Sequence, residues 1–143
     1  MTVDTILAAK GGDVTTIEPT ATLAAAAALL AERKIGAAVV LGAGDRIAGI
    51  LSERDIVRAL AQDGPKALDQ PLSQSMTRNV ATCAREDSIQ SLMERMTARK
   101  FRHMPVVEDN RKVGIVSIGD VVKQRLGEME RESEAMRDYI QTA

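Results

Sequence analysis

A short polar motif occurs twice in the sequence, each time at the end of an apolar run. Residues 49–55 read GILSERD and residues 114–120 read GIVSIGD, so that a serine precedes an aspartate by three positions in both. A carboxylate held at a helix N-terminus, beside free N–H groups, can accept two hydrogen bonds from a vicinal diol such as the 2′ and 3′ hydroxyls of ribose. The candidate ribose-binding residues are Ser52, Asp55, Ser117 and Asp120.

The same motif has a purely structural interpretation. A serine at an N-cap and an aspartate in the first turn stabilise any helix through hydrogen bonds to its free N–H groups and through the helix dipole. The motif alone therefore leaves both interpretations open, and the surrounding residues must decide between them.

A basic cluster precedes the second motif. The segment RKFRHMPVV contains Arg99, Lys100, Arg102 and His103, whereas the first copy has Gly36 and Ala37 at the positions of Arg102 and His103. Arginine suits phosphate because its planar guanidinium donates two parallel hydrogen bonds. We therefore expect the site of Asp120 to be the better phosphate-binding site of the two.

Arg54 lies inside the first motif and has two interpretations. It can be an ordinary solvated arginine, or it can point across a symmetric interface toward a phosphate in the second cleft. The candidate phosphate-binding residues are thus Arg102, His103, Arg54 and Lys100.

The motifs belong to a longer internal repeat. Val14 aligns with Val80 and Thr16 with Thr82 at an offset of 66 residues, and the offset is 65 at the pair Gly49 and Gly114. A steady offset of this length indicates two copies of one structural unit. We assign residues 10–62 to repeat 1, 63–79 to a linker, 80–123 to repeat 2 and 124–143 to a C-terminal helix extension.

Each copy predicts the same order of elements. Threonine or serine N-caps (Thr20 or Thr22, and Asp87 or Ser88) precede apolar residues at helical spacing. Two short strands with a turn between them follow, and a helix begins at the Ser-x-x-Asp motif. The predicted fold class is α+β (α/β), with two β-α-β-β-α repeats. One copy of roughly 55 residues is too small to bury its own sheet and helices, so we expect the two to pack with pseudo-twofold symmetry.

On these residues the chain resembles the tandem cystathionine-β-synthase (CBS) domains of the Bateman module, and in particular a stand-alone bacterial CBS pair. The resemblance covers roughly residues 14–123, and its most specific element is the doubled Gly-h-h-Ser-x-x-Asp motif, where h is apolar. In members that bind adenosine compounds, the resemblance implies that Asp55 and Asp120 bind ribose, that Ser52 and Ser117 assist, and that Arg102 and His103 meet phosphate. The implied adenine pocket comprises Thr82, Val80, Met104, Pro105, Ile115, Thr16 and Ala38. Strand propensity is the favoured explanation for the threonines, and plain packing explains Val80 and Pro105 nearly as well.

Composition argues against several other classes of protein. The net charge is −1 and aromatic residues make up 1% of the chain, which disfavours binding to nucleic acids or anionic membranes. Cys83 is the only cysteine, and the opening segment lacks the apolar core of a signal peptide, so we expect a cytoplasmic protein. No His/Cys/Asp grouping has metal-ligand spacing, and no nucleophile with a base is evident, so we expect neither a metal site nor an enzyme.

The C-terminal segment predicts a helix that needs a partner. Six residues alternate spacings of four and three, as in a heptad seam: Val122, Leu126, Met129, Ser133, Met136 and Ile140. The seam either folds back on its own module or pairs with a second chain, and we favour a homodimer. The segment VDTILAA near the N-terminus is expected to form a short helix alongside.

The favoured function is a regulatory, energy-sensing module that binds an adenine nucleotide between the repeats and signals by conformational change to an unknown effector protein. AMP is the favoured ligand, NAD is next, and ADP, ATP and S-adenosylmethionine share the same ribosyl-adenine. The alternative is a nucleotide-independent dimerisation or interaction module whose sites are vestigial.

Overall fold

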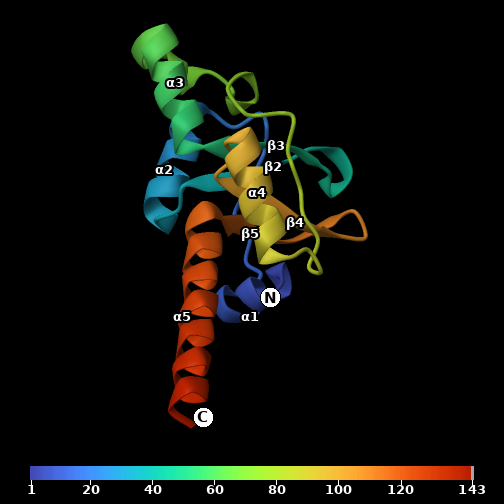
Figure 1. Cartoon of the computed structure of the whole chain (residues 1–143). Coiled ribbons are helices and arrows are strands. Elements are labelled where there is room, and N and C mark those ends of the chain that lie inside the picture. Colours follow the sequence, from blue (N-terminus) through green and yellow to red (C-terminus); the bar gives the residue numbers. More distant parts are fainter. Residues whose placement is uncertain (143) are drawn as a thin grey trace.

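The computed structural model describes residues 1–142 and contains two repeats of mixed helix and strand (Figure 1). Repeat 1 holds a three-stranded sheet in the order β1-β2-β3, in which β1 runs parallel and β3 antiparallel to β2. Its elements are β1 (Thr16–Ile17), α2 (Leu23–Arg33), β2 (Ala37–Leu41), β3 (Ile47–Ser52) and α3 (Glu53–Asp63). The expected order of strand, helix, strand, strand, helix is confirmed for this copy.

Repeat 2 has the same order with a shorter first strand. Its elements are α4 (Ile89–Arg99), β4 (His103–Glu108), β5 (Arg111–Ser117) and α5 (Ile118–Thr142). In place of the predicted first strand, Cys83 forms a single parallel bridge to Val106. The chain turns away at once because the Ala84 N–H donates to the carboxylate of Asp87 at 2.9 Å, which closes a turn instead of extending the ladder.

Local sequence explains where the helices begin. The Thr22 hydroxyl accepts from the Ala25 N–H at 3.1 Å, and the Ser88 hydroxyl accepts from the Ser91 N–H at 3.0 Å. These side chains satisfy N–H groups that have no partner inside a helix. Of the expected alternatives, Thr22 and Ser88 are therefore the N-caps.

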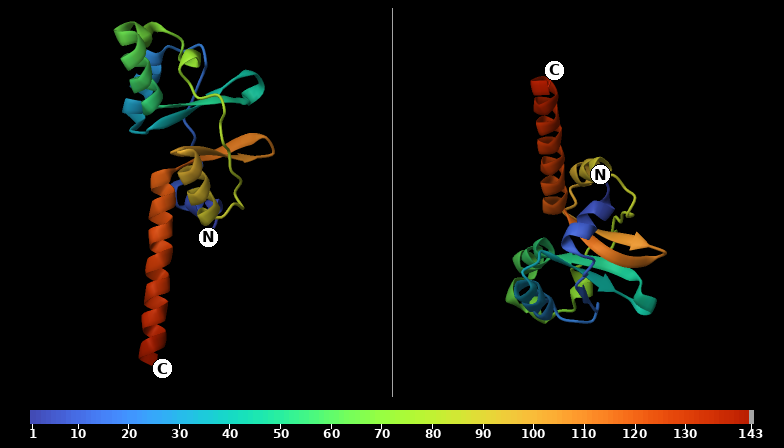
Figure 2. Two further views of the ribbon diagram at one scale, coloured as in Figure 1. Left: turned by 45° about the horizontal axis from the view of Figure 1, so that its top comes forward. Right: turned by 90° about the horizontal axis from the view of Figure 1, so that it is seen from below.

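The two sheets lie face to face, with helices on their outer sides (Figures 1 and 2). Alternation along the strands shows which residues face which layer. Ala38 and Val40 belong to the core cluster of repeat 1, and Met104 and Val106 to that of repeat 2. The intervening Val39, which is 0% exposed, and other alternate residues are buried outside these clusters, between the sheets.

The segment that precedes repeat 1 packs on repeat 2. Helix α1 (Val3–Lys10) buries Val3, Ile6 and Leu7 in the core of repeat 2, and the Val3 N–H donates to the Asp87 carbonyl at 2.9 Å. The expected short N-terminal helix is present, and it contacts β5 as well as α5. It therefore completes a core that the second copy does not close alone.

The segment that precedes repeat 2 packs in turn on repeat 1. Residues 63–79, expected to be a linker, form the 3-10 helices η2 (Gly64–Asp69) and η3 (Leu72–Gln74). Ala67, Leu72 and Met76 are buried in the core of repeat 1. Thr77 then pairs with Ile50 through two backbone hydrogen bonds of 2.9 Å. This segment is thus part of the first repeat's packing and not a free connection.

Helix α1 and residues 63–79, which we call the crossing segments, each lie against the sheet of the repeat that they do not directly precede. Two matching glycines allow this close approach. A Cβ on Gly49 would lie 2.6 Å from the Thr77 carbonyl oxygen, and a Cβ on Gly114 would lie 2.5 Å from Cδ2 of Leu7. At Gly49 the near atom is backbone and cannot rotate away, whereas at Gly114 the Leu7 side chain would have to move. The glycine of each Gly-h-h-Ser-x-x-Asp motif therefore serves a packing role that is separate from the carboxylate.

Among the helices of residues 1–142, none combines the length and apolar character needed to cross a bilayer.

We expect Gly49→Ala to destabilise the protein by about 1–3 kcal/mol, the usual cost of overpacking, because its neighbour is backbone and cannot rotate away. Gly42→Ala is the matched control, since its Cβ would meet only ordinary contacts from 3.4 Å. Urea unfolding followed by circular dichroism measures both. Equal midpoints for the two variants would contradict a tight crossing at Gly49.

Candidate functional site

The first motif forms a closed capping box at the start of α3. Asp55 Oδ2 accepts from the Ser52 N–H at 2.9 Å and from the Ser52 hydroxyl at 3.2 Å, and the Asp55 N–H donates back to Ser52 Oγ at 3.4 Å. Asp55 is 4% exposed and is the only charged residue classed as buried among residues 1–142. A buried carboxylate is costly unless its oxygens have hydrogen-bond partners.

Two further side chains hold the other oxygen of this carboxylate. Asp55 Oδ1 accepts from the Thr77 hydroxyl at 3.3 Å and lies 3.5 Å from Arg58 Nη1. Thr77 comes from the crossing segment and Arg58 from the next turn of α3. The serine–aspartate motif is therefore part of a four-residue polar cluster that sequence spacing alone did not predict.

The second motif has the same box but a different additional partner. The Ser117 N–H donates to Asp120 Oδ2 at 2.9 Å, and the Asp120 N–H donates to Ser117 Oγ at 3.1 Å. Lys10, at the end of α1, donates to the same Oδ2 at 2.8 Å and to the Ile115 carbonyl at 3.0 Å. An ammonium of the chain itself thus occupies a position beside the second candidate ribose carboxylate.

The electrostatics of Asp120 follow from these contacts. Partial burial raises the pKa of the Asp120 carboxyl, but the hydrogen bonds from Lys10 and Ser117 outweigh it, so that the pKa lies below its ordinary value. The carboxylate is ionised and paired at neutral pH. A diol that approached this carboxylate would compete with a bound ammonium.

One cleft brings residues of both repeats together. It has a volume of about 180 Å³. Repeat 1 contributes Gly36, Ile50, Ser52, Glu53, Arg54, Asp55 and Arg58, repeat 2 contributes Lys100, Phe101, Arg102 and His103, and Thr77 comes from between them. The residues predicted to bind phosphate therefore share this cleft with Asp55 and Ser52. The sequence had favoured Asp120 as their partner.

The cleft carries a positive charge. Four cations (Arg54, Arg58, Lys100 and Arg102) face two carboxylates (Glu53 and Asp55), which gives a formal balance of 4 − 2 = +2 with a neutral histidine. Such a balance favours an anionic ligand, and arginine in particular favours phosphate. Arg54 indeed lies beside residues of the other repeat, since it also borders a shallow hollow with Lys100 and Arg102.

His103 lies at the contact between the repeats. A Cβ on Gly36 would be 3.4 Å from His103 Nε2, so the glycine at this position leaves room for the imidazole of the other copy. Burial lowers the pKa of His103, and Lys10 and Arg102 lower it further, against the opposing effects of Glu53 and Asp120. The ring is therefore neutral at pH 7 and can donate or accept a hydrogen bond.

The expected adenine positions fall into two groups. Met104 and Ala38 are 0% and 2% exposed and belong to the two core clusters, so their side chains face helices and not the cleft. The others lie near the sheets or at their edges: Thr16 in β1, Val80 and Thr82 before the Cys83 bridge, and Pro105 opposite Ile115 in the β4–β5 ladder. None of the seven lines the cleft of Asp55.

Sequence reasoning missed Lys10, Thr77, Arg58 and Glu53. A signal for the first two was available: at the offset of 66, residues 6–13 align with 72–79, which places Lys10 opposite Met76 and Gly11 opposite Thr77. Both segments precede the aligned part of the repeat, which starts at Val14 in the first copy and at Val80 in the second. Arg58 and Glu53 flank Asp55 in sequence but gain significance only in the folded cleft.

Cys83 and metal-ligating groups add no chemistry to the cleft. Cys83 is 5% exposed, and burial raises the pKa of its thiol to about 12. The thiol is therefore protonated at physiological pH. Within residues 1–142, no three His, Cys, Asp or Glu side chains are grouped so that they could hold a metal ion.

Comparisons with known proteins agree on one family. The family model described as "CBS domain" matches residues 10–62 and 72–127. The crystal structure of a CBS-domain-containing protein from Agrobacterium tumefaciens is 46% identical, with a TM-score of 0.85 over 87% of this chain and 99% of that one. A CBS domain pair solved in complex with 5′-methylthioadenosine and S-adenosyl-L-methionine is 26% identical, with a TM-score of 0.79 over 90% and 98% of the two chains.

Two curated relatives are longer than this chain. An uncharacterized 17.7 kDa protein of Acidianus ambivalens is 33% identical over 111 residues, which is 77% of this chain and 66% of that protein. A mitochondrial CBS domain-containing protein of Arabidopsis thaliana is 33% identical over 116 residues, or 78% and 56% of the two. The chain thus spans just under two thirds or less of these relatives.

We expect Lys10→Gln to raise the pKa of the Asp120 carboxyl, because it removes the cation that helps to hold this pKa low. A carbon-detected NMR titration of aspartate carboxyls measures the shift. Because the folded pKa is depressed, the pair stabilises the fold above the unfolded aspartate pKa, and this stability is lost as pH falls through the folded value. The half-exposed pair is worth about 1 kcal/mol or less. Lys66→Gln is the control, and an unchanged Asp120 pKa in Lys10→Gln would contradict the contact.

Proposed function

The chain belongs to the CBS-domain family, and we propose that it binds an adenine nucleotide, AMP in the first place, in the cleft between its two repeats and signals by conformational change. A CBS pair is a regulatory module. One observation carries the proposal: the capped carboxylate of Asp55 from repeat 1 and the basic residues Arg102 and His103 from repeat 2 line one cavity.

The chemistry of the cleft favours a particular class of adenosine compound. The CBS pair in complex with 5′-methylthioadenosine and S-adenosyl-L-methionine supports an adenosine ligand in general. S-adenosylmethionine carries a sulfonium cation next to the ribose, where Arg54, Arg58 and Arg102 would repel it. AMP places a dianionic phosphate there instead. NAD, ADP and ATP also bring phosphate but are larger.

The size of the cleft bears on the mechanism. A volume of about 180 Å³ is below the roughly 300–1,000 Å³ of most small-molecule sites. A nucleotide therefore requires the repeats to move apart or to rotate. Because a ligand shifts an equilibrium only by its differential affinity for two states, this required movement makes the cleft a suitable sensor.

The position of the ribose follows from the partners of the two carboxylates. Asp55 shares its cavity with the phosphate-binding candidates, whereas Asp120 accepts from Lys10 at 2.8 Å. We therefore place the nucleotide at Asp55 and Ser52, and not at Asp120 as the sequence alone favoured. Filling the second site would require Lys10 to release its carboxylate.

A route to an effector protein begins at the same residues. The Ile118 N–H donates to the Arg102 carbonyl at 2.8 Å, and Ile118 is the first residue of α5. A phosphate that draws Arg102 into the cleft would thereby shift the base of the long helix. The effector that reads this movement is a protein outside this chain.

The alternative is an interaction module without a ligand. It is favoured by the fact that both carboxylates already have protein partners and by the exposed apolar residues of α5. The charge of the cleft argues for the nucleotide.

A thermal-shift screen against AMP, ADP, ATP, NAD, NADH and S-adenosylmethionine tests the proposal. At 100 times its dissociation constant, a ligand adds roughly 2.7 kcal/mol to the stability of the folded state. We expect AMP to give the largest shift and S-adenosylmethionine the smallest. No shift with any of the six would favour the interaction module.

The same assay locates the site. Asp55→Asn and Asp120→Asn are a matched pair, because each keeps the size of the side chain at the third residue of its helix. We expect Asp55→Asn to weaken AMP binding by about tenfold or more, since a bond to a charged acceptor is worth roughly 1.5–3 kcal/mol. Asp120→Asn should leave AMP binding nearly unchanged, and the opposite ranking would place the nucleotide in the second site.

Arg102→Gln separates phosphate from nucleoside recognition. We expect the variant to bind AMP about tenfold more weakly than the wild type, because a guanidinium–phosphate bond is lost. Its affinity for adenosine should be unchanged. Isothermal titration calorimetry with both ligands measures the difference, and Arg46→Gln, in the distant β2–β3 connection, is the control. An equal loss for AMP and adenosine would show that Arg102 does not contact the phosphate.

A further inference from the structure

Helix α5 carries an apolar stripe that no other segment of residues 1–142 covers. Val122, Leu126, Met129, Met136 and Ile140 are between 41% and 67% exposed. Together with Ser133 they form the heptad seam of the sequence, which we call the α5 seam. The C-terminal half of α5 projects away from the module, as both views in Figure 2 show. Contiguous exposed apolar residues of this kind mark an interaction surface.

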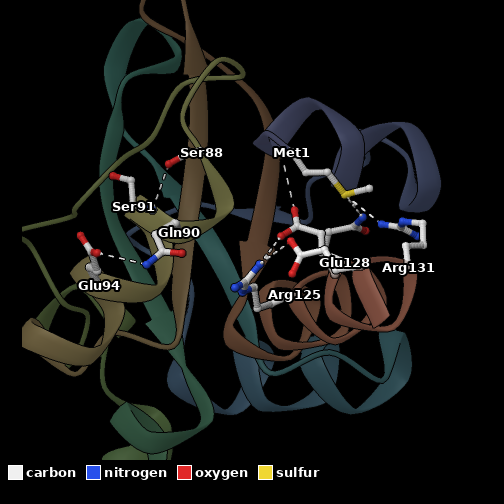
Figure 3. A network of polar contacts seen from close by, with 10 residues as sticks. Met1, Ser88, Gln90, Ser91, Glu94, Arg125, Glu128 and Arg131 are labelled. Carbon is white, nitrogen blue, oxygen red and sulfur yellow. Dashed lines mark hydrogen bonds and ion pairs between the residues drawn. The ribbon is translucent and has the colours of Figure 1, made fainter. Parts of the chain in front are cut away.

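The seam does not face the module to which α5 belongs. Val121 is 0% exposed and packs in the core of repeat 2, and successive helix residues are rotated by about 100°. Figure 3 shows the neighbouring inner contact: the N-terminal ammonium of Met1 lies 3.6 Å from Glu128, which accepts from Arg125 at 2.9 Å. These contacts fix the inner face of α5, and the seam points about a quarter turn away from it.

An open groove continues the seam beside the module. It is lined by Ile118, Gly119, Val122, Lys123, Leu126 and Glu130, among others. Gly119 stands one heptad before Leu126, and a Cβ there would meet only the Ser117 hydroxyl, at 3.6 Å. A second helix can therefore approach closely at the base of α5 as well as along its projecting half.

We propose that the α5 seam pairs with the α5 seam of a second copy of this chain as a parallel, in-register, two-stranded coiled coil. In heptad terms Leu126, Ser133 and Ile140 take position a, and Val122, Met129 and Met136 take position d. The flanking charges choose between orientations. Position g then holds Arg125 and Glu132, and position e holds Lys123, Glu130 and Arg137.

The parallel arrangement matches opposite charges throughout. In such a pair each g residue faces the e residue five positions later in the partner chain. Arg125 then faces Glu130, and Glu132 faces Arg137, each twice by symmetry. Within its own chain Arg125 bonds Glu128 at 2.9 Å and lies 3.9 Å from Glu132. In the dimer Glu132 would exchange this long contact for one with Arg137 of the partner subunit. Glu132 is 71% exposed.

The antiparallel arrangement brings like charges together. With all six seam layers overlapping, e faces e and g faces g, so that Glu130 meets Glu130, Glu132 meets Glu132, and Lys123 meets Arg137. Like charges at these positions are destabilising. A shift by one heptad relieves the repulsion but removes two of the six layers from contact. Only the parallel pair combines full overlap with complementary charge.

The parallel pair is also compatible with the modules. Because the seam lies to the side of each module, a twofold axis along the coiled coil places the two modules on opposite sides of it. Each chain then presents its nucleotide cleft at the same end of the assembly.

Charge reversal in the full-length chain tests the orientation, with the dimer dissociation constant measured by sedimentation equilibrium. We expect Arg137→Glu to weaken the dimer by roughly tenfold, and Glu132→Arg added to it to restore most of the loss. A fully overlapped antiparallel pair predicts the reverse for Arg137→Glu, which would then face Lys123. A heptad-shifted pair predicts no rescue. Either of these results overturns the proposal.

Cross-linking gives an independent readout. Ile140→Cys places thiols in the same layer of a parallel pair, and mild oxidation should yield a disulfide-linked dimer. In either antiparallel register the two Cα atoms are too far apart for the roughly 7 Å limit of a disulfide. The wild type is the control, since its Cys83 is buried.

The double variant Met129→Glu, Met136→Glu should be monomeric while its far-ultraviolet circular dichroism is unchanged, because both side chains are more than half exposed. A wild type that is monomeric at all concentrations, or a double variant that remains a dimer, overturns the proposal.

Discussion

Neither repeat closes its own hydrophobic core, and the rest of the structure depends on how this is solved. Helix α1, which precedes repeat 1, buries Val3, Ile6 and Leu7 in repeat 2, and the segment before repeat 2 buries Leu72 and Met76 in repeat 1. The crossing is possible because glycine stands where each segment meets the sheet. The core of each unit thus includes residues that precede the other unit in the chain, and the two sheets are held face to face.

The crossing segments also decide the chemistry of the two motifs. Each delivers one polar side chain to the carboxylate of the repeat it covers: Thr77 reaches Asp55, and Lys10 reaches Asp120. A hydroxyl is neutral and can be shared with a ligand, whereas an ammonium neutralises the carboxylate. Two copies of one motif therefore differ in their polar partners because of residues outside the motifs. The asymmetry arises from the segments and not from the motifs.

The sequence predicted what depends on local spacing. The N-caps at Thr22 and Ser88 and the serine–aspartate pairs at Asp55 and Asp120 follow from residues three apart. The repeat follows from a steady offset of 65 or 66 residues along the chain. It did not predict that Arg102 and His103 share a cleft with Asp55, because that pairing depends on how one repeat is rotated against the other. The burial of Met104 and Ala38 was missed for a related reason: strand alternation was known, but not which face meets the helices.

The cleft and the long helix are connected through one backbone contact. Arg102 lines the cleft, and its carbonyl accepts a hydrogen bond from the N–H of Ile118, the first residue of α5. If two α5 helices pair in parallel, the bases of both are held together, and a rotation of one requires a matching rotation of the other. Occupation of one cleft would then alter the affinity of the second, and by thermodynamic linkage the effect must be equal in both directions. If both proposals hold, a chain whose described residues form one charged cleft would act in the dimer as half of a two-site sensor, and the steepness of the response would depend on the dimer.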